Sequence, residues 1–117
     1  STEEMLPAVA QGAIGIERRE NDIRIATMLE AIHNSKTALL LSAERAFLEA
    51  LDGSCETPIA GLAEISNGNL RFRGEILKPD GSEVFSDEQV APKEDSTLMG
   101  VEMAQKLLNK AGSDFFL

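Results

Sequence analysis

Apolar residues recur every three or four positions between Asp22 and Ile32, which is the spacing of one face of an amphipathic helix. Asn21 or Asp22 can accept a hydrogen bond from the first turn and so cap this helix. The residues on its apolar face are Ile25, Met28, Leu29 and Ile32. The pattern therefore predicts a short helix with one apolar side.

A second helix is predicted almost at once, with Asn34 or Ser35 as its cap. It ends at Asp52-Gly53, where glycine can adopt the left-handed conformation that closes a helix. The residues that share its apolar face are Leu40, Ala43, Phe47, Ala50 and Leu51.

The last helix is predicted to begin near Asp95 or Ser96 and to end at residues 110–112, where a lysine and a glycine suit a helix C-terminus. Its predicted buried residues are Leu98, Val101, Ala104 and Leu108.

Between these two helices the apolar residues alternate with polar or small ones, as they do in strands with one buried face. Asn67-Gly68 is a tight-turn dipeptide between two such stretches and predicts an antiparallel hairpin. A second turn at residues 79–81 leads to a weaker strand from Glu83 to Gln89. The alternating apolar residues are Ile59, Gly61, Ala63 and Ile65 before the turn, and Leu70, Phe72 and Ile76 after it.

The predicted order from residue 34 to residue 117 is α-β-β-β-α, an α+β domain whose three-stranded antiparallel sheet is covered by helices on one face. Residues 1–33 differ. The apolar run from Ala13 to Arg19 is typical of a strand buried on both faces of a parallel sheet, and one strand and one helix cannot complete such a sheet. We therefore interpret residues 1–33 as the end of another domain, of the α/β class.

Charge and composition narrow the function classes. The 117 residues include 11 Lys and Arg against 20 Asp and Glu, for a net charge of −9, which argues against nucleic-acid binding. No apolar stretch approaches the roughly 20 residues that cross a bilayer, so we expect no membrane span. The N-terminus lacks the features of an export signal, and a single cysteine cannot form an internal disulfide, so we expect a cytoplasmic location.

Cys55 is the only cysteine and follows Gly53 in a predicted loop, where a thiol can meet a reactant. It can equally be a small buried apolar residue. His33 is the only histidine, so a Cys-His pair has one candidate base, and the two residues alone cannot complete a zinc site. No metal site is expected.

Arg18 and Arg19 are the only adjacent basic pair, and they lie at the end of the predicted buried strand. The carboxyl ends of strands in open α/β sheets face the ligand crevice, where a guanidinium can bind a carboxylate. Surface pairing with Glu17 or Glu20 is the alternative. Because side chains alternate along a strand, at most one of the two arginines points into a given site.

Three motifs carry a resemblance to a known family: LPAVAQGAIGIE at residues 6–17, AERAFL at residues 43–48 and LDGSCETPIAG at residues 51–61. Residues 79–82 and 100–112 continue it. In order and spacing these motifs closely resemble the C-terminal part of the porphobilinogen deaminase, or hydroxymethylbilane synthase, family. The similarity covers nearly the whole chain from Leu6 onward.

The resemblance implies a cytoplasmic transferase of heme and tetrapyrrole biosynthesis, monomeric when complete. It joins four porphobilinogen units into linear hydroxymethylbilane and releases ammonia. The chain grows on a dipyrromethane cofactor, which a thioether links to the cysteine matched here by Cys55. That cysteine acts as an anchor, because a thiolate captures the electrophile left when ammonia departs.

The resemblance also assigns parts of this chain to the family's three domains. Residues 1–33 would end the second, periplasmic-binding-protein-like domain, and residues 34–117 would form the C-terminal cofactor-attachment domain. Arg19 matches an arginine that contacts the carboxylates of the cofactor and the growing pyrrole chain, whereas Arg18 occupies a variable position. The catalytic aspartate belongs to the first domain, so no catalytic residue is expected here, and this portion alone is expected to be inactive. The alternative is a free-standing α+β protein-interaction module.

Overall fold

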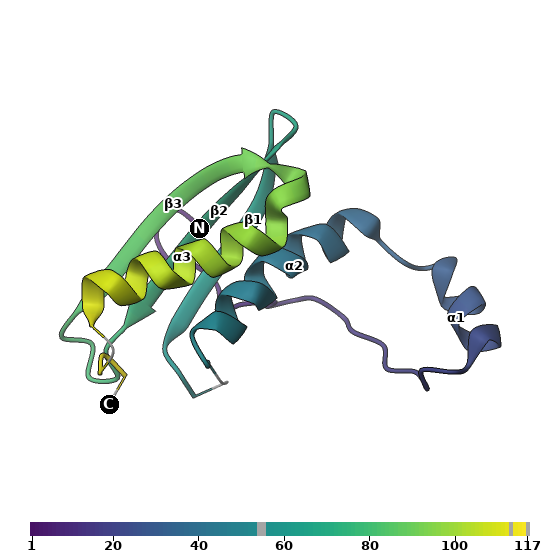
Figure 1. The fold of residues 1–117 in the computed structure, drawn as a ribbon, viewed down its shortest axis with the longest axis horizontal. Helices are drawn as coiled ribbons and strands as arrows, with labels where there is room; N and C mark the ends of the chain where they lie inside the picture. The colour runs from purple at the N-terminus through teal and green to yellow at the C-terminus, as the bar shows by residue number, and fades with distance from the viewer. Residues whose placement is uncertain (54–55, 113, 117) are drawn as a thin grey trace.

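The computed structural model describes residues 1–53, 56–112 and 114–116, and it confirms the predicted α+β fold (Figure 1). Three antiparallel strands form one sheet in the order β1-β2-β3. The elements are α1 (Ile23–Glu30), α2 (Ser35–Ala50), β1 (Ile59–Ser66), β2 (Asn69–Leu77), β3 (Val84–Pro92), the short 3₁₀ helix η1 (Lys93–Asp95) and α3 (Ser96–Ala111). No helix in the described part of the chain is long and apolar enough to span a bilayer.

The β1-β2 hairpin turns at Asn67 and Gly68, as the sequence predicts. Ser66 pairs with Asn69, so the loop has two residues, and both have positive φ values of 51° and 80°. Two left-handed residues are the mark of a type I′ turn, whose twist matches that of the strands. The third strand is longer than predicted and ends at Pro92 rather than Gln89.

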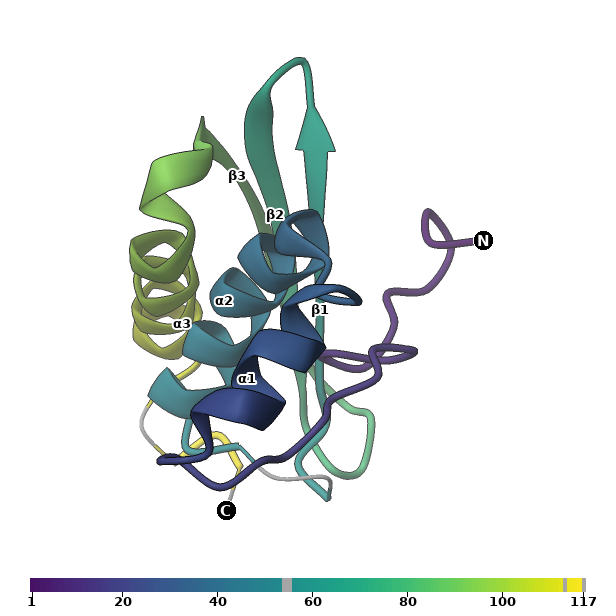
Figure 2. The same ribbon diagram turned by 90° about the vertical axis from the view of Figure 1, so that its right-hand side faces the viewer.

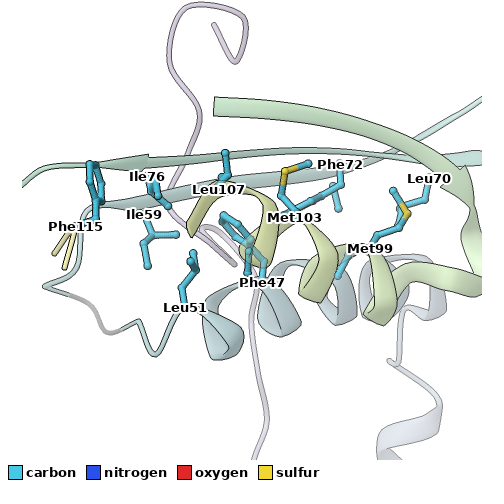
Figure 3. Close-up of a cluster of buried hydrophobic side chains, with 13 residues drawn as sticks. Phe47, Leu51, Ile59, Leu70, Phe72, Ile76, Met99, Met103, Leu107 and Phe115 are labelled. Atoms are coloured by element: carbon cyan, nitrogen blue, oxygen red, sulfur yellow. The ribbon is translucent and has the colours of Figure 1, made fainter. Parts of the chain in front are cut away.

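Helices α2 and α3 lie together on one face of the sheet (Figure 2). The core between them contains Phe47 and Phe72, whose rings meet edge to face with their centroids 5.2 Å apart. Figure 3 shows this cluster continuing to Phe115 at one end and Leu70 at the other. The buried residues of this core all lie between Ala43 and Phe115 in the sequence.

The buried face of α3 is not the predicted one. Leu98 is 54% exposed, and Val101 and Leu108 are only half-buried, while Ala104 is buried as predicted. The face that meets the core consists of Met99, Met103 and Leu107, with Gly100 and Ala104 beside them. Gly100 explains this difference. Because a Cβ there would collide with the carbonyl oxygen of Ala43, only glycine allows α3 to approach the α2 backbone so closely, and α3 therefore turns Gly100 toward α2.

The end of α2 also differs in detail from the prediction. Ala50 is exposed, and the left-handed residue that follows the helix is Asp52, with a φ of 51°, not Gly53. Gly53 has a packing role instead. A Cβ there would lie 2.6 Å from the Cδ1 atoms of both Leu48 and Ile59, so the ends of these two side chains would have to shift to admit a larger residue.

The predicted strand from Ala13 to Arg19 is absent. These residues form no regular element, and Ile14 is 94% exposed. A strand needs a hydrogen-bonded neighbour, and the described residues place none beside this segment. Helix α1 follows as predicted, capped by Asp22, yet none of its residues is buried and Met28 is 58% exposed.

Strand β3 and helix α3 are linked by charge. The Asp87 carboxylate lies 2.7 Å from Lys110 Nζ and 2.9 Å from Lys106 Nζ. The hydrogen bonds from Lys110 and Lys106 hold the pKa of Asp87 well below its usual value. These ion pairs thus attach β3, the sheet edge farthest from β1, to helix α3.

Candidate functional site

The loop between α2 and β1 carries the predicted anchor, Cys55, which lies outside the described residues, as does Ser54. Both ends of the loop are held by backbone hydrogen bonds. The Gly53 N–H donates to the Leu48 carbonyl at 2.9 Å, and the Leu77 N–H donates to the Pro58 carbonyl at 3.0 Å. The two flanks of the loop are therefore hydrogen-bonded to α2 and to β2.

The two adjacent arginines have different surroundings. Arg18 Nη1 donates to the carbonyl oxygens of Arg19 and Glu20, at 3.0 and 2.8 Å, so its guanidinium is used locally. Arg19 is exposed, and within the part of the chain that the structure describes its side chain has no hydrogen bond or ion pair. Of the pair, Arg19 has the guanidinium that is available to a ligand.

The structure does not bring Arg19 close to the flanks of Cys55. Arg19 precedes α1, which leads into the N-terminal end of α2, whereas Gly53 follows the C-terminal end of α2. A 16-residue helix is about 24 Å long. Figure 1 shows the segment before α1 leaving the sheet on one side and the C-terminal end of α2 near the foot of the sheet. His33 also precedes α2, so its position does not support a Cys-His pair.

A groove of about 630 Å³ separates the segment around Ile14 and Ile16 from α1 and α2. Its walls are apolar at Leu29 and Leu41, and its charged lining residues are Arg18, Glu30 and Arg45. The groove cannot be predicted from the sequence, because it depends on where α1 lies relative to α2. Among the described residues, no three side chains of the His, Cys, Asp and Glu types are grouped closely enough to hold a metal ion.

Glu44 is a residue that the sequence analysis missed. It is only 6% exposed, and its two carboxylate oxygens accept backbone N–H groups from separate segments. Oε2 accepts from Ala10 at 2.8 Å, and Oε1 accepts from Ala63 at 3.0 Å. Charge-assisted hydrogen bonds of this kind contribute about 1.5–3 kcal/mol each, and they offset the burial of the charge. The sequence feature that could have identified Glu44 is its position, because it places a carboxylate on the apolar face of a predicted helix, directly after Ala43.

The segment before Ala10 lies against the sheet. The Gly61 N–H donates to the Pro7 carbonyl at 3.1 Å, and Ala8 forms an isolated antiparallel bridge with Ala60. Farther toward the N-terminus, Arg73 pairs with Glu3 at 3.1 Å and is itself almost buried. Figure 2 shows this segment beside β1, away from the helix layer.

Comparisons with known proteins agree with the family resemblance that the sequence motifs indicate. Residues 38–109 match the family described as "Porphobilinogen deaminase, C-terminal domain". The chain is 58% identical over 114 residues to the porphobilinogen deaminase of Paracoccus denitrificans, covering 97% of this chain and 36% of that protein. It is 44% identical over 115 residues to that of Nitrobacter hamburgensis, covering 98% of this chain and 36% of that protein. It is 46% identical over 119 residues to the chloroplastic porphobilinogen deaminase of Pisum sativum, covering 99% of this chain and 32% of that protein. The chain thus spans about a third of the length of these relatives.

Proposed function

Because this chain belongs to the porphobilinogen deaminase family, as its C-terminal domain, we propose that it is the cofactor-attachment part of a hydroxymethylbilane synthase. The complete transferase would join four porphobilinogen units head to tail, in the cytoplasm and as a monomer, within heme and tetrapyrrole biosynthesis. The observation that carries the proposal is the match of residues 38–109 to this domain, which includes the loop with the single cysteine.

The chemistry of the available groups fits a dipyrromethane held by a thioether. Cys55 is the only cysteine in the chain, so a carbon–sulfur bond has one candidate sulfur atom. The dipyrromethane, when bound, supplies the pyrrole end to which further units are added. Gly53 and Pro58 fix the two ends of the loop, which would keep the attachment point in one place during repeated additions.

Arg19 is the residue we propose for contact with the acidic side chains of the cofactor or the growing pyrrole chain. A guanidinium binds a carboxylate through two parallel hydrogen bonds, and the Arg19 side chain has no such partner among the described residues. Because Arg19 is distant from the flanks of Cys55 here, the proposal needs the rest of the complete protein to bring this segment over the site. The other acid-binding arginines and the catalytic aspartate would lie outside residues 1–117.

We also propose that residues 1–33 end the second domain of the complete protein and that residues 34–117 form the third. Exposed apolar side chains support this division. Ile14, Met28 and Ile32 are each more than half exposed, which is unusual for residues of this kind that cluster on one side of a folded unit. Packing against the two thirds of the relatives' length that this chain lacks would cover them.

The proposal is tested by comparing the 117-residue chain with the complete protein. We expect the complete protein to form hydroxymethylbilane from porphobilinogen and to have an intact mass above that of the polypeptide by two linked pyrrole units. The chain alone is expected to show no turnover, because the acid-base groups lie elsewhere. Sustained bilane formation by the chain alone would contradict this division of roles, and a complete protein with the bare polypeptide mass would contradict the anchor.

Arg18 and Arg19 provide a matched pair for testing the ligand contact. In the complete protein we expect Arg19→Leu to raise the KM for porphobilinogen by roughly tenfold or more, the equivalent of one lost charge-assisted hydrogen bond. Arg18→Leu removes the same charge, but the hydrogen bonds it removes are only those to local carbonyl oxygens. We therefore expect the KM to change by less than threefold. Equal effects of the two substitutions on KM would show that only the net charge of the segment matters.

A free-standing interaction module is the second candidate, and the groove between α1 and α2 is the observation that favours it. In that case the exposed apolar residues would bind a separate protein. The mass measurement distinguishes the two functions, because an interaction module has no reason to carry linked pyrroles.

A further inference from the structure

Glu44 has no part in the attachment or binding roles described above, yet it is the most deeply buried carboxylate among the described residues. We propose that Glu44 is a positioning residue that holds residues 7–10 against the free edge of β1. The connection toward Arg19 then turns at residues 10–12. The inference rests on the proposed function in one respect, namely that the segment leading to Arg19 must be placed relative to the cofactor-attachment domain.

The edge of the sheet explains why a carboxylate is needed. Strand β1 has β2 on one side only, so alternate N–H groups of β1 point away from the sheet and need other acceptors. Of these, the Gly61 N–H donates to the Pro7 carbonyl, and the Ala63 N–H donates to Glu44 Oε1. The N-terminal segment pairs with the edge for a short distance only, and Glu44 takes over where it departs.

The departure point is strained, and Glu44 holds it. Ala10 has a φ of 60°, a left-handed conformation that is unfavourable for alanine. Its N–H donates to Glu44 Oε2 at 2.8 Å, and its carbonyl oxygen accepts from the Ala13 N–H at 3.1 Å. Gly12, with a φ of 82°, completes the change of direction. One carboxylate therefore connects the strained turn to the sheet edge.

The chain is packed against the domain before this turn and exposed after it. Before it, Val9 packs against the hydrophobic core and Pro7 is hydrogen-bonded to β1. After it, residues 14–20 are exposed and form no regular element. Residues 7–10 are therefore bound to the sheet of the proposed 34–117 domain although they precede its proposed boundary, and the exposed segment begins only after the turn, at Ile14. Without Glu44 the exposed segment would begin closer to Leu6 and would be longer.

Amide hydrogen exchange in the 117-residue chain tests this role without any substrate. In Glu44→Ala we expect exchange at the Ala10 and Ala63 amides to accelerate at least tenfold, while the amides between β2 and β3 stay within a factor of two. Glu49→Ala is the matched control, because Glu49 is exposed on the same helix. Glu44→Gln is the second variant in case the alanine variant does not fold, since it keeps one acceptor oxygen and so must release Ala10 or Ala63.

Two results would overturn the proposal. Unchanged exchange at Ala10 in a folded Glu44→Ala variant would mean that Pro7 and Val9 hold the segment without the carboxylate. Equal acceleration of all core amides would mean that Glu44 serves general stability only.

In the complete protein we expect Glu44→Gln to keep the covalent adduct mass but to raise the KM for porphobilinogen several-fold, with kcat changed less. An unchanged KM would contradict the positioning role. Failure of the proposed function is recognised separately, because the unsubstituted complete protein would then lack the adduct.

Discussion

Cys55→Ser in the complete protein is expected to abolish covalent attachment of the dipyrromethane and, with it, bilane formation. A free cysteine is already a few per cent thiolate near neutral pH, whereas a serine hydroxyl needs an adjacent general base to become nucleophilic. The chain has no second cysteine that could replace Cys55. Intact-mass spectrometry measures the result directly, and the variant is expected to have the mass of the polypeptide alone.

Ser54→Ala is the control for this experiment, because it alters the neighbouring position of the same loop and leaves the thiol in place. We expect this variant to retain the adduct and most of its turnover. A retained adduct in Cys55→Ser would exclude Cys55 as the anchor. Loss of the adduct in both variants would instead point to a requirement for the loop as a whole.

Gly100→Ala is expected to lower the free energy of unfolding by about 2–3 kcal/mol. Alanine normally favours a helix over glycine by about 1 kcal/mol, so the expected sign is opposite to the helix propensity. The reason is packing. The added Cβ would collide with the Ala43 carbonyl oxygen and lie 2.8 Å from the Phe47 backbone nitrogen. Backbone atoms cannot rotate away as side chains can, so α2 and α3 must separate and loosen the core.

Urea unfolding followed by circular dichroism measures this change. Gln105→Ala is the matched control, since Gln105 is exposed on the same helix and its substitution tests propensity without the contact. We expect the control to change stability by less than about 0.5 kcal/mol. A Gly100→Ala variant as stable as the control would mean that α2 and α3 can move apart without loss, and that Gly100 does not set their spacing.

Local features of the fold could be predicted because they depend on neighbouring residues. Asn67-Gly68 specifies its turn through two left-handed conformations that few other residues adopt. Asn34 caps α2 through its own side chain, which accepts from the Thr37 N–H. These interactions span two or three positions, so they can be recognised before any tertiary contact is known.

The side of α3 that faces the core could not be predicted in this way. Leu98 and Met99 are both apolar and adjacent, and the amphipathic pattern is compatible with burial of either. The choice is made by Gly100, which faces Ala43 of another helix across a distance in sequence of more than fifty residues. The same holds for Glu44, because the Ala10 and Ala63 N–H groups that donate to its carboxylate are near it only in space.

By itself, the sequence determined the N-terminal caps of α1 and α2 to within a residue, the hairpin, the order of the elements after residue 34 and the motifs that identify the family, because each depends on short-range geometry or on residue identity. Only the tertiary structure decided which side of α3 enters the core, that residues 13–19 form no strand, and that Glu44 joins the N-terminal segment to the edge of β1. Those features follow from close packing and from the pairing of buried polar groups, both of which require the positions of residues distant in the sequence.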